Sequence, residues 1–285
     1  MAPYMTGLID SFNRDGFLVV RDAIPGAVLD AFIGVLEAEV DRRAGAMFER
    51  GEISDPCADE PFATRWYRIW EERGGEPKPP TWHACVFGPE LYALWTHAAI
   101  LDAVELVVGP EIQASGDYIL RPKLPSLNLL PWHQDSGYMP ATEQYPWPTV
   151  WVPFVRVHAG SGAMQFIPGS HRQPIREHRK SDGAVYATPE RDPAAGREVV
   201  TPELDRGDFV IFSNYVFHRS TAGRDPSVRW SIDFRFSPAG TPVGDHLWFH
   251  GMTHVVRSAR DPGLIPSWDE VVAQWERSPQ RVKSP

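Results

Sequence analysis

Residues 228–236 read Val-Arg-Trp-Ser-Ile-Asp-Phe-Arg-Phe, so apolar and polar side chains alternate with a period of two. Successive side chains of a β-strand point to opposite faces, and this stretch therefore predicts a strand with one apolar and one polar face. The polar face carries four side chains: Arg229, Ser231, Asp233 and Arg235. Either the apolar set packs against helices or the polar set lines a site, and both can hold together.

Three other stretches have the composition of strands. Residues 149–157, 163–167 and 209–212 are short, rich in β-branched or aromatic residues, and bounded by Gly, Pro, Ser and Asp. Regularly spaced short strands with such turn residues are typical of a sandwich or a barrel.

The N-terminal part of the chain has a helical period instead. Apolar residues recur at helical spacing between Val28 and Val40, which predicts an amphipathic helix that begins near Pro25. Similar patterns predict helices over 62–70, 98–108 and 267–275.

These patterns indicate one domain over residues 1–285. We expect a mostly helical buttress over 1–110, a β core over 111–240, and a C-terminal extension with a final helix over 241–285.

The composition excludes several classes of protein. The net charge of −9 argues against a nucleic-acid partner and against a polybasic membrane anchor. Two cysteines among 285 residues cannot form a disulfide framework or a four-sulfur zinc site, so the reducing cytoplasm is the expected location. The sequence carries no signal-peptide pattern, no apolar run long enough to span a bilayer, and no nucleotide-binding or GxSxG motif. We expect no membrane partner, and a monomer or a homodimer.

The strongest local motif is Pro131-Trp-His-Gln-Asp-Ser-Gly137. In an extended chain His133 and Asp135 point the same way, so that an imidazole and a carboxylate could reach one ion. His218, which follows the predicted strand over 207–212, is the best candidate for a second imidazole. Two histidines and one carboxylate leave three octahedral positions open, as in non-haem Fe(II) oxygenases. The alternative is an ordinary hydrogen-bonded pair at a strand end.

Arg229 lies eleven residues after His218. A guanidinium fork suits a distal carboxylate such as the C5 end of 2-oxoglutarate, and Ser220 or Ser231 could add a hydrogen bond. The alternative is a buried structural ion pair of Arg229 with Asp208 or Asp233.

These motifs occur in one order: His133-Gln-Asp135, Pro168-Gly-Ser-His171, Gly207-Asp208, His218-x-Ser220 and Arg229. In that order the sequence resembles the phytanoyl-CoA dioxygenase family over roughly residues 8 to 275. The resemblance implies an Fe(II)- and 2-oxoglutarate-dependent dioxygenase that uses O2 and is related to ectoine hydroxylases. The fold it implies is mainly β with flanking helices, a double-stranded β-helix (jelly-roll, cupin-like) core buttressed by N-terminal and C-terminal helices.

The resemblance also implies roles for single residues. It places iron on the catalytic set His133, Asp135 and His218, and the carboxylate of Asp135 implies oxygenation rather than halogenation. It assigns the C5 carboxylate of 2-oxoglutarate to Arg229. The other residues expected to contact the co-substrate are Ser220, Trp151 and Lys123 from the resemblance. Ser231 is added because it lies on the predicted polar face of the strand.

The candidates for substrate contact are less closely tied to the motifs: Tyr138, Trp147, Trp132, Arg121 and Arg235. The two arginines could hold a substrate carboxylate or pair with acids. We expect the enzyme to hydroxylate, or otherwise oxidise, an unactivated C–H bond of a small molecule in a bacterial biosynthetic or secondary-metabolite pathway, with release of succinate and CO2. The segment 173–201 is a candidate shield against water.

Other functions remain as alternatives. A cupin-like metal enzyme that does not use 2-oxoglutarate would have no need of Arg229, and a non-catalytic binding protein would have no need of an intact metal set. An acyl-CoA hydroxylase would need a basic entrance, which the net charge disfavours. Desaturation, cyclisation, epoxidation and endoperoxidation begin in the same way as hydroxylation and stay open.

Overall fold

The computed structural model describes residues 3–75, 82, 85–114, 118–125, 130–138, 143–179, 188–242 and 252–277. Parts of the expected C-terminal extension and of the segment 173–201 thus lie outside the described residues. The N-terminal part contains most of the helices, with one short strand: α1 (Pro3–Asp15), β1 (Phe17–Val20), α2 (Gly26–Glu49), α3 (Phe62–Glu72), α4 (Pro89–Trp95) and α5 (Ala98–Val108).

The rest of the described chain is mostly strands: β2 (Ile112–Ala114), β3 (Ile119–Lys123), β4 (Leu130–His133), β5 (Thr149–Pro153), β6 (Met164–Phe166), β7 (His178–Arg179), β8 (Thr188–Pro189), β9 (Phe209–Phe212), β10 (His218–Ser220), β11 (Arg229–Pro238) and β12 (His254–Arg257). A short helix, α6 (Asp135–Tyr138), follows β4, and α7 (Trp268–Arg277) is the last helix of the described chain. Two 3-10 turns cover Ser170–Arg172 and Pro262–Leu264.

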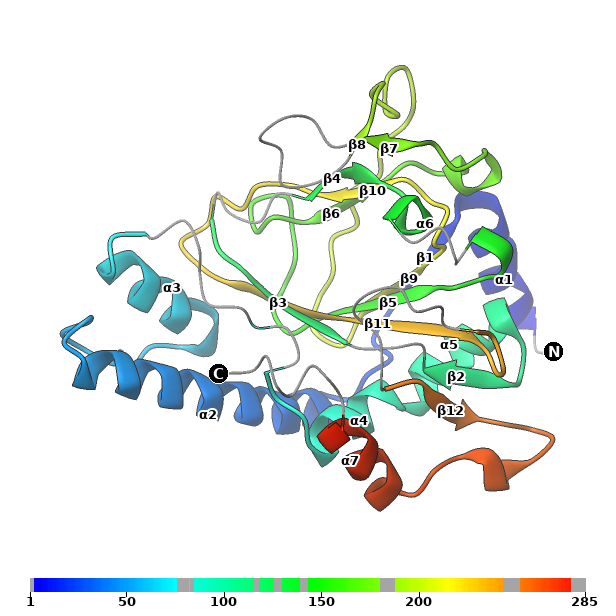
Figure 1. Ribbon diagram of the computed structural model, residues 1–285. Coiled ribbons are helices and arrows are strands. Elements are labelled where there is room, and N and C mark those ends of the chain that lie inside the picture. Colours follow the sequence, from blue (N-terminus) through cyan, green and yellow to red (C-terminus); the bar gives the residue numbers. More distant parts are fainter. Residues whose placement is uncertain are drawn as a thin grey trace.

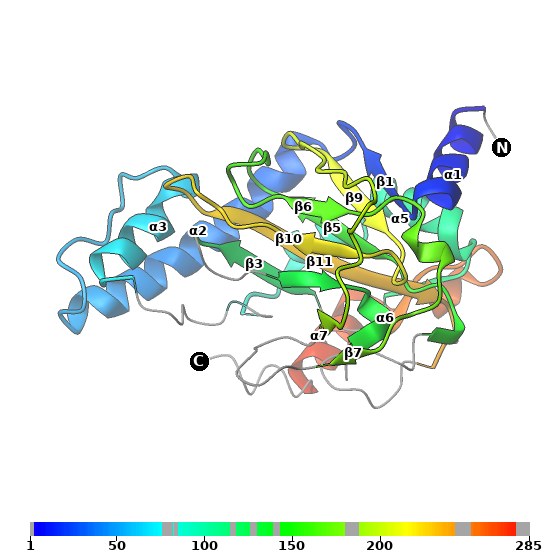
Figure 2. The ribbon, with the colours of Figure 1, turned by 90° about the horizontal axis from the view of Figure 1, so that it is seen from above.

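Most of the described strands form two facing antiparallel sheets, and β7 and β8 pair in a separate two-stranded sheet. The larger has the order β1-β9-β5-β11-β2-β12, with β3 also paired to β11, and the smaller has the order β4-β10-β6. Figure 1 shows the smaller sheet above the larger one, with α2, α3 and α4 beyond the outer face of the larger sheet. Seen from above in Figure 2, β10 crosses over β11. This is the jelly-roll core that the sequence predicted.

Strand β11 joins the helical layer to the interior of the jelly roll. Trp230, Ile232 and Phe234 on one face are fully buried in the cluster that contains Phe32 and Leu36 of α2. The opposite face carries Arg229 and Arg235, which are also buried. The apolar side chains therefore pack against the helices, while the charged ones lie on the opposite face of the strand, toward the smaller sheet.

The first long helix is longer than its apolar pattern predicts. α2 begins directly after Pro25, as expected, and buries Leu29, Phe32, Leu36 and Val40, but it continues through Met47 to Glu49. No single helix of the described chain is long and apolar enough to cross a bilayer, although the bent pair α4 and α5 would pass that test of length and composition together.

The C-terminal helix is held by stacked aromatic rings. Trp268 and Trp275 of α7 stack on Phe87 with ring centroids 5.6 and 4.7 Å apart, and Trp268 also contacts Tyr92 of α4. Offset rings at such separations add to the free energy gained by burial alone. Part of the high tryptophan content therefore fastens the C-terminal helix to the helical layer.

Two predicted elements differ from the structure. The strand predicted over 149–157 ends at Pro153, and Val157 bridges Leu204 instead, because a proline has no N–H to continue the ladder. The segment 173–201 is not merely a loop, since it contains the strand pair β7–β8.

The carboxylate of Asp208 fastens β1 to β9. It accepts hydrogen bonds from Asp22 N at 2.8 Å, Arg21 Nη1 at 2.6 Å and Asp205 N at 3.0 Å. Burial alone would raise the pKa of Asp208, but these hydrogen bonds and the charge of Arg21 outweigh it, and the pKa lies below its usual value.

We therefore expect Asp208→Asn to lower the free energy of unfolding by about 2 kcal/mol at neutral pH. The stabilisation by ionised Asp208 is present above the unfolded pKa of about 3.9 and is lost as the pH falls through the lower folded pKa. The free energy of unfolding is measured by denaturant titration across this pH range for the wild type, Asp208→Asn and the exposed control Asp205→Asn. Parallel pH profiles for the wild type and Asp208→Asn would contradict the prediction.

Candidate metal centre and active site

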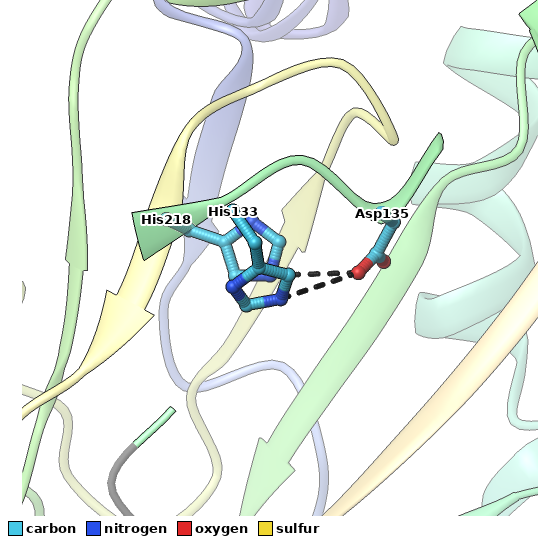
Figure 3. A group of neighbouring side chains, drawn as sticks. All are labelled: His133, Asp135 and His218. Carbon is cyan, nitrogen blue, oxygen red and sulfur yellow. Dashed lines mark ion pairs between the residues drawn. The ribbon is translucent and has the colours of Figure 1, made fainter. Parts of the chain in front are cut away.

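Three buried side chains converge between the two sheets. His133 is the last residue of β4 and His218 the first of β10, and the two are direct partners in the antiparallel register. Asp135 is the first residue of α6, not part of an extended strand as the sequence analysis assumed, yet its carboxylate reaches both rings. Asp135 Oδ1 lies 3.6 Å from Nε2 of each histidine, as Figure 3 shows.

The donor set fits a metal ion. Nδ1 of His133 donates to Pro131 O at 2.8 Å, and Nδ1 of His218 donates to Val216 O at 3.0 Å. These bonds leave both Nε2 atoms as acceptors, so two imidazole lone pairs and one carboxylate oxygen meet with no proton between them. Three acceptors in a buried space repel one another unless a cation lies among them. The possible ligand atoms all lie within 4.8 Å of one another, close enough for one ion.

The protonation states suit a divalent cation. Burial, and then the neighbouring His133, lowers the pKa of His218 to about 3, so this ring is neutral at physiological pH. Burial would raise the pKa of Asp135, but His133, His218 and Arg235 outweigh it, and the pKa stays below its usual range. A carboxylate with neutral imidazole is the form that binds a metal.

Two groups around the three ligands were missed by sequence reasoning. Thr149, the first residue of β5, donates from Oγ1 to Asp135 Oδ2 at 2.9 Å and so fixes the second carboxylate oxygen. Phe212 of β9 packs against the ring of His218, with centroids 4.6 Å apart. The alternation of residues 149–153 could have found Thr149, because it shares a face with the predicted Trp151.

A second cluster of predicted residues surrounds the guanidinium of Arg229. Arg229 is 4% exposed, stacks over Trp151 of β5 at 5.0 Å, and has an Nε with no hydrogen-bond partner among the described residues. Burial lowers the pKa of Arg229 to about 10, so it stays charged at neutral pH. Ser231 on the same face is buried, with a hydroxyl that likewise makes no hydrogen bond within the described part of the chain. A buried cation with an open donor fits an anion.

Lys123 adds a second basic group. It lies opposite Arg229 in the β3–β11 register, and its Nζ donates to Ser220 Oγ at 2.8 Å. The side chain passes Gly162, which has φ +82°, and a Cβ at that position would lie 2.9 Å from Lys123 Cε. Burial, and then the charges of Arg229 and Arg121, lowers the pKa of Lys123 to about 6.

The two acids considered as structural partners of Arg229 are bound elsewhere. Asp208 holds Arg21, and Asp233 holds Arg121 at 2.6 Å, with Arg235 at 4.0 Å. Among the described residues Arg229 therefore has no ion-pair partner within 4 Å, although the charge of Asp233 still acts on it and partly offsets the effect of burial on its pKa.

The candidates for substrate contact are divided by the structure. The ring of Tyr138 lies 5.2 Å from that of His133, and Arg235 stacks over Trp147 at 5.5 Å. Arg121 bonds Asp233 and is partly exposed. The structure does not bring Trp132 to the metal ligands.

The reason is the alternation of β4. Trp132 points to the face opposite His133, where it packs with Ile167 and Phe217 beneath Arg219. Because Trp132 is next to His133 in the strand, its ring lies on the opposite face of the sheet and does not contact the metal ligands.

The site has the features of a metal-binding protein. Its jelly roll holds a buried set of two histidines and one carboxylate, and a buried arginine lies beside them. Residues 12–230 match the model of the phytanoyl-CoA dioxygenase (PhyH) family, and the chain belongs to this family. A curated relative, the 1-deoxypentalenic acid 11-beta-hydroxylase of Streptomyces arenae, is 28% identical over 183 residues, which cover 59% of this chain and 62% of the relative. The chain thus spans about three-fifths of the curated relatives it matches.

Solved structures show the same fold. The non-heme monooxygenase ThoJ in its nickel complex aligns with TM-score 0.60 and 19% identity over 97% of each chain. The epimerase SnoN in complex with Fe3+, alpha ketoglutarate and nogalamycin RO aligns with TM-score 0.54 and 17% identity over 86% of this chain and 90% of SnoN.

We expect Thr149→Val to weaken the binding of a divalent metal by about tenfold, because the ligand Asp135 loses the hydrogen bond that orients it. Thr149→Ser keeps the hydroxyl and is expected to bind metal as the wild type does. Competition between Co(II) and a chelating dye measures the affinities. Equal affinities for Thr149→Val and Thr149→Ser would show that this bond does not orient the ligand.

Proposed function

We propose that the protein is an Fe(II)- and 2-oxoglutarate-dependent dioxygenase. It hydroxylates, or otherwise oxidises, an unactivated C–H bond of a small molecule in bacterial secondary metabolism, with release of succinate and CO2. The observation that carries the proposal is the pairing of a buried three-ligand metal set with a buried arginine whose Nε is open, both between the same two sheets. The family, the hydroxylase relative, and a neighbour that holds Fe3+ and alpha ketoglutarate support it.

Bound iron supplies redox chemistry with O2, coupled to the oxidative decarboxylation of 2-oxoglutarate. The chain's own part is to hold and orient. His133, Asp135 and His218 would hold the metal on one face and leave the other face for the co-substrate and O2. The apolar ring of Phe212 packs against His218 and would keep water from that side of the metal.

The co-substrate is bound by the second cluster. Arg229 is preorganised on Trp151 and presents an open Nε to the C5 carboxylate, while Lys123 and Ser220 supply a further cation and a hydroxyl. Beside Arg229 the amine of Lys123 has a pKa of about 6, and a bound dianion would favour its charged form. The aromatic rings of Tyr138 and Trp147, and the guanidinium of Arg235, are the groups we assign to the substrate.

We expect Arg229→Gln to weaken 2-oxoglutarate binding by at least about 30-fold, equivalent to about 2 kcal/mol, because a buried carboxylate loses its charged partner. Anaerobic titration of the visible charge-transfer band of the Fe(II)·2-oxoglutarate complex measures the affinity. Arg219→Gln is the matched control, since Arg219 lies on the face of β10 away from the metal and stacks on Trp132.

An unchanged affinity in Arg229→Gln would overturn the assigned role. If the wild type binds Fe(II) but gives no band with 2-oxoglutarate, the protein is a cupin-like metal enzyme without this co-substrate.

The pKa of Lys123 gives the binding of 2-oxoglutarate a pH dependence. The charged form, present below a pH of about 6, binds a dianion more tightly than the neutral form. Affinity should therefore fall as the pH rises above about 6, by up to tenfold per unit, until the higher pKa of Lys123 in the complex is passed. The charged groups nearest Lys123 are Arg229 on β11 and Arg121 on its own strand.

Lys123→Met should bind 2-oxoglutarate more weakly at low pH and show no such slope. The dissociation constant is measured from about pH 5.5 to 8.5 with the metal saturating at every point. The same slope in Lys123→Met as in the wild type would assign the pH dependence to another group.

A further inference from the structure

Gln134, between the two metal ligands of the HxD motif, is fully buried, and each of its four polar atoms makes a hydrogen bond. Its backbone N–H donates to His178 Nε2 at 3.1 Å, its Oε1 accepts from Arg176 N at 2.9 Å, and its Nε2 donates to Tyr215 O at 2.8 Å. Its carbonyl accepts from Gly137 N at 2.9 Å. A buried residue whose polar atoms are all hydrogen-bonded is held in one conformation, and the loss of a partner leaves a costly unpaired group.

His178 belongs to a segment far from this motif in sequence. Its Nδ1 donates to Arg176 O at 2.7 Å, which leaves Nε2 as the acceptor for Gln134. Its ring lies between Tyr138, with centroids 5.3 Å apart, and Phe217 at 6.4 Å. A Cβ on residue 137 would come within 2.1 Å of His178 Nδ1, so this approach requires Gly137.

The same network reaches both segments that carry metal ligands. Tyr215, whose carbonyl accepts from Gln134, precedes Val216, whose carbonyl orients the ring of His218. On the other side Ser136 N donates to Asn214 O at 3.1 Å. The strap, residues 173–179, supplies two further partners of Gln134, Arg176 N and His178 Nε2, and β7 with its partner β8 lies over β4 in Figure 1.

We propose that His178 is a positioning residue for the metal centre: it holds the peptide of Gln134, from whose two sides His133 and Asp135 project, and so couples metal affinity to docking of the strap. The proposal rests on the metal site of the proposed function. Since such coupling is reciprocal, a bound metal must also stabilise the docked strap.

The test compares two replacements of one ring. His178→Phe keeps the packing on Tyr138 and Phe217 but removes the acceptor for Gln134 N–H, whereas His178→Gln offers an amide oxygen in its place. Arg179→Ala is the control on the same strand, because the side chain of Arg179 is exposed and its one ion pair within the described residues is with the exposed Glu177. Co(II) is the probe metal, added to the apoprotein without 2-oxoglutarate.

We expect His178→Phe to bind Co(II) about tenfold more weakly than the wild type, and His178→Gln and Arg179→Ala to stay within about threefold. Wild-type affinity in His178→Phe, accompanied only by a lower unfolding temperature, would make His178 a structural anchor and overturn the proposal. In contrast, if Asp135→Ala binds Co(II) as tightly as the wild type does, the proposed function itself is refuted.

Hydrogen exchange gives a readout that does not depend on a folded His178→Phe. Addition of Co(II) to the wild type should slow amide exchange in the strap, residues 173–179, by about the factor by which the metal favours the docked strap. His178→Gln and Arg179→Ala, which keep an acceptor for Gln134 N–H, should show a similar slowing. Exchange in the strap that is indifferent to Co(II) in the wild type would overturn the coupling.

Discussion

The structure depends on the two-faced burial of β11. Its apolar side chains, Trp230 and Phe234 among them, fill the core shared with the helices. Because the strand alternates, this packing places its charged side chains in the space between the sheets. Burying Arg229 and Arg235 costs free energy that only a compensating charge can offset. Packing of the hydrophobic face thus leaves the polar side chains buried between the sheets, where they form the candidate site.

The two ends of this lining have different chemistry. At one end, Arg235 lies opposite Thr149 in the register, and Thr149 donates a hydrogen bond to the carboxylate of Asp135. Hydrogen-bond acceptors converge at this end, and a cation is needed there. Near Arg229 the register brings Lys123 opposite, and donors converge where an anion is needed. One antiparallel ladder therefore sets a cation-seeking and an anion-seeking group side by side, which is what a metal with a chelating dicarboxylate requires.

Sequence reasoning reached much of this because period-two patterns survive folding. The alternation over 228–236 correctly gave both faces of β11, and the family resemblance gave the jelly roll. It failed where a property depends on a partner far along the chain. Trp132 adjoins a metal ligand but faces away from it, and Thr149 and His178 carry no motif of their own.

The sequence by itself determined which residue types are present at which spacing: an HxD pair, a later histidine and an arginine eleven residues beyond it. Only the tertiary structure decided which of them meet. The register of β10 against β4 sets His218 opposite His133, and the register of β11 against β3 sets Arg229 opposite Lys123. Registers between distant strands follow from the burial of whole faces, because a slip of one residue would turn every side chain to the other face.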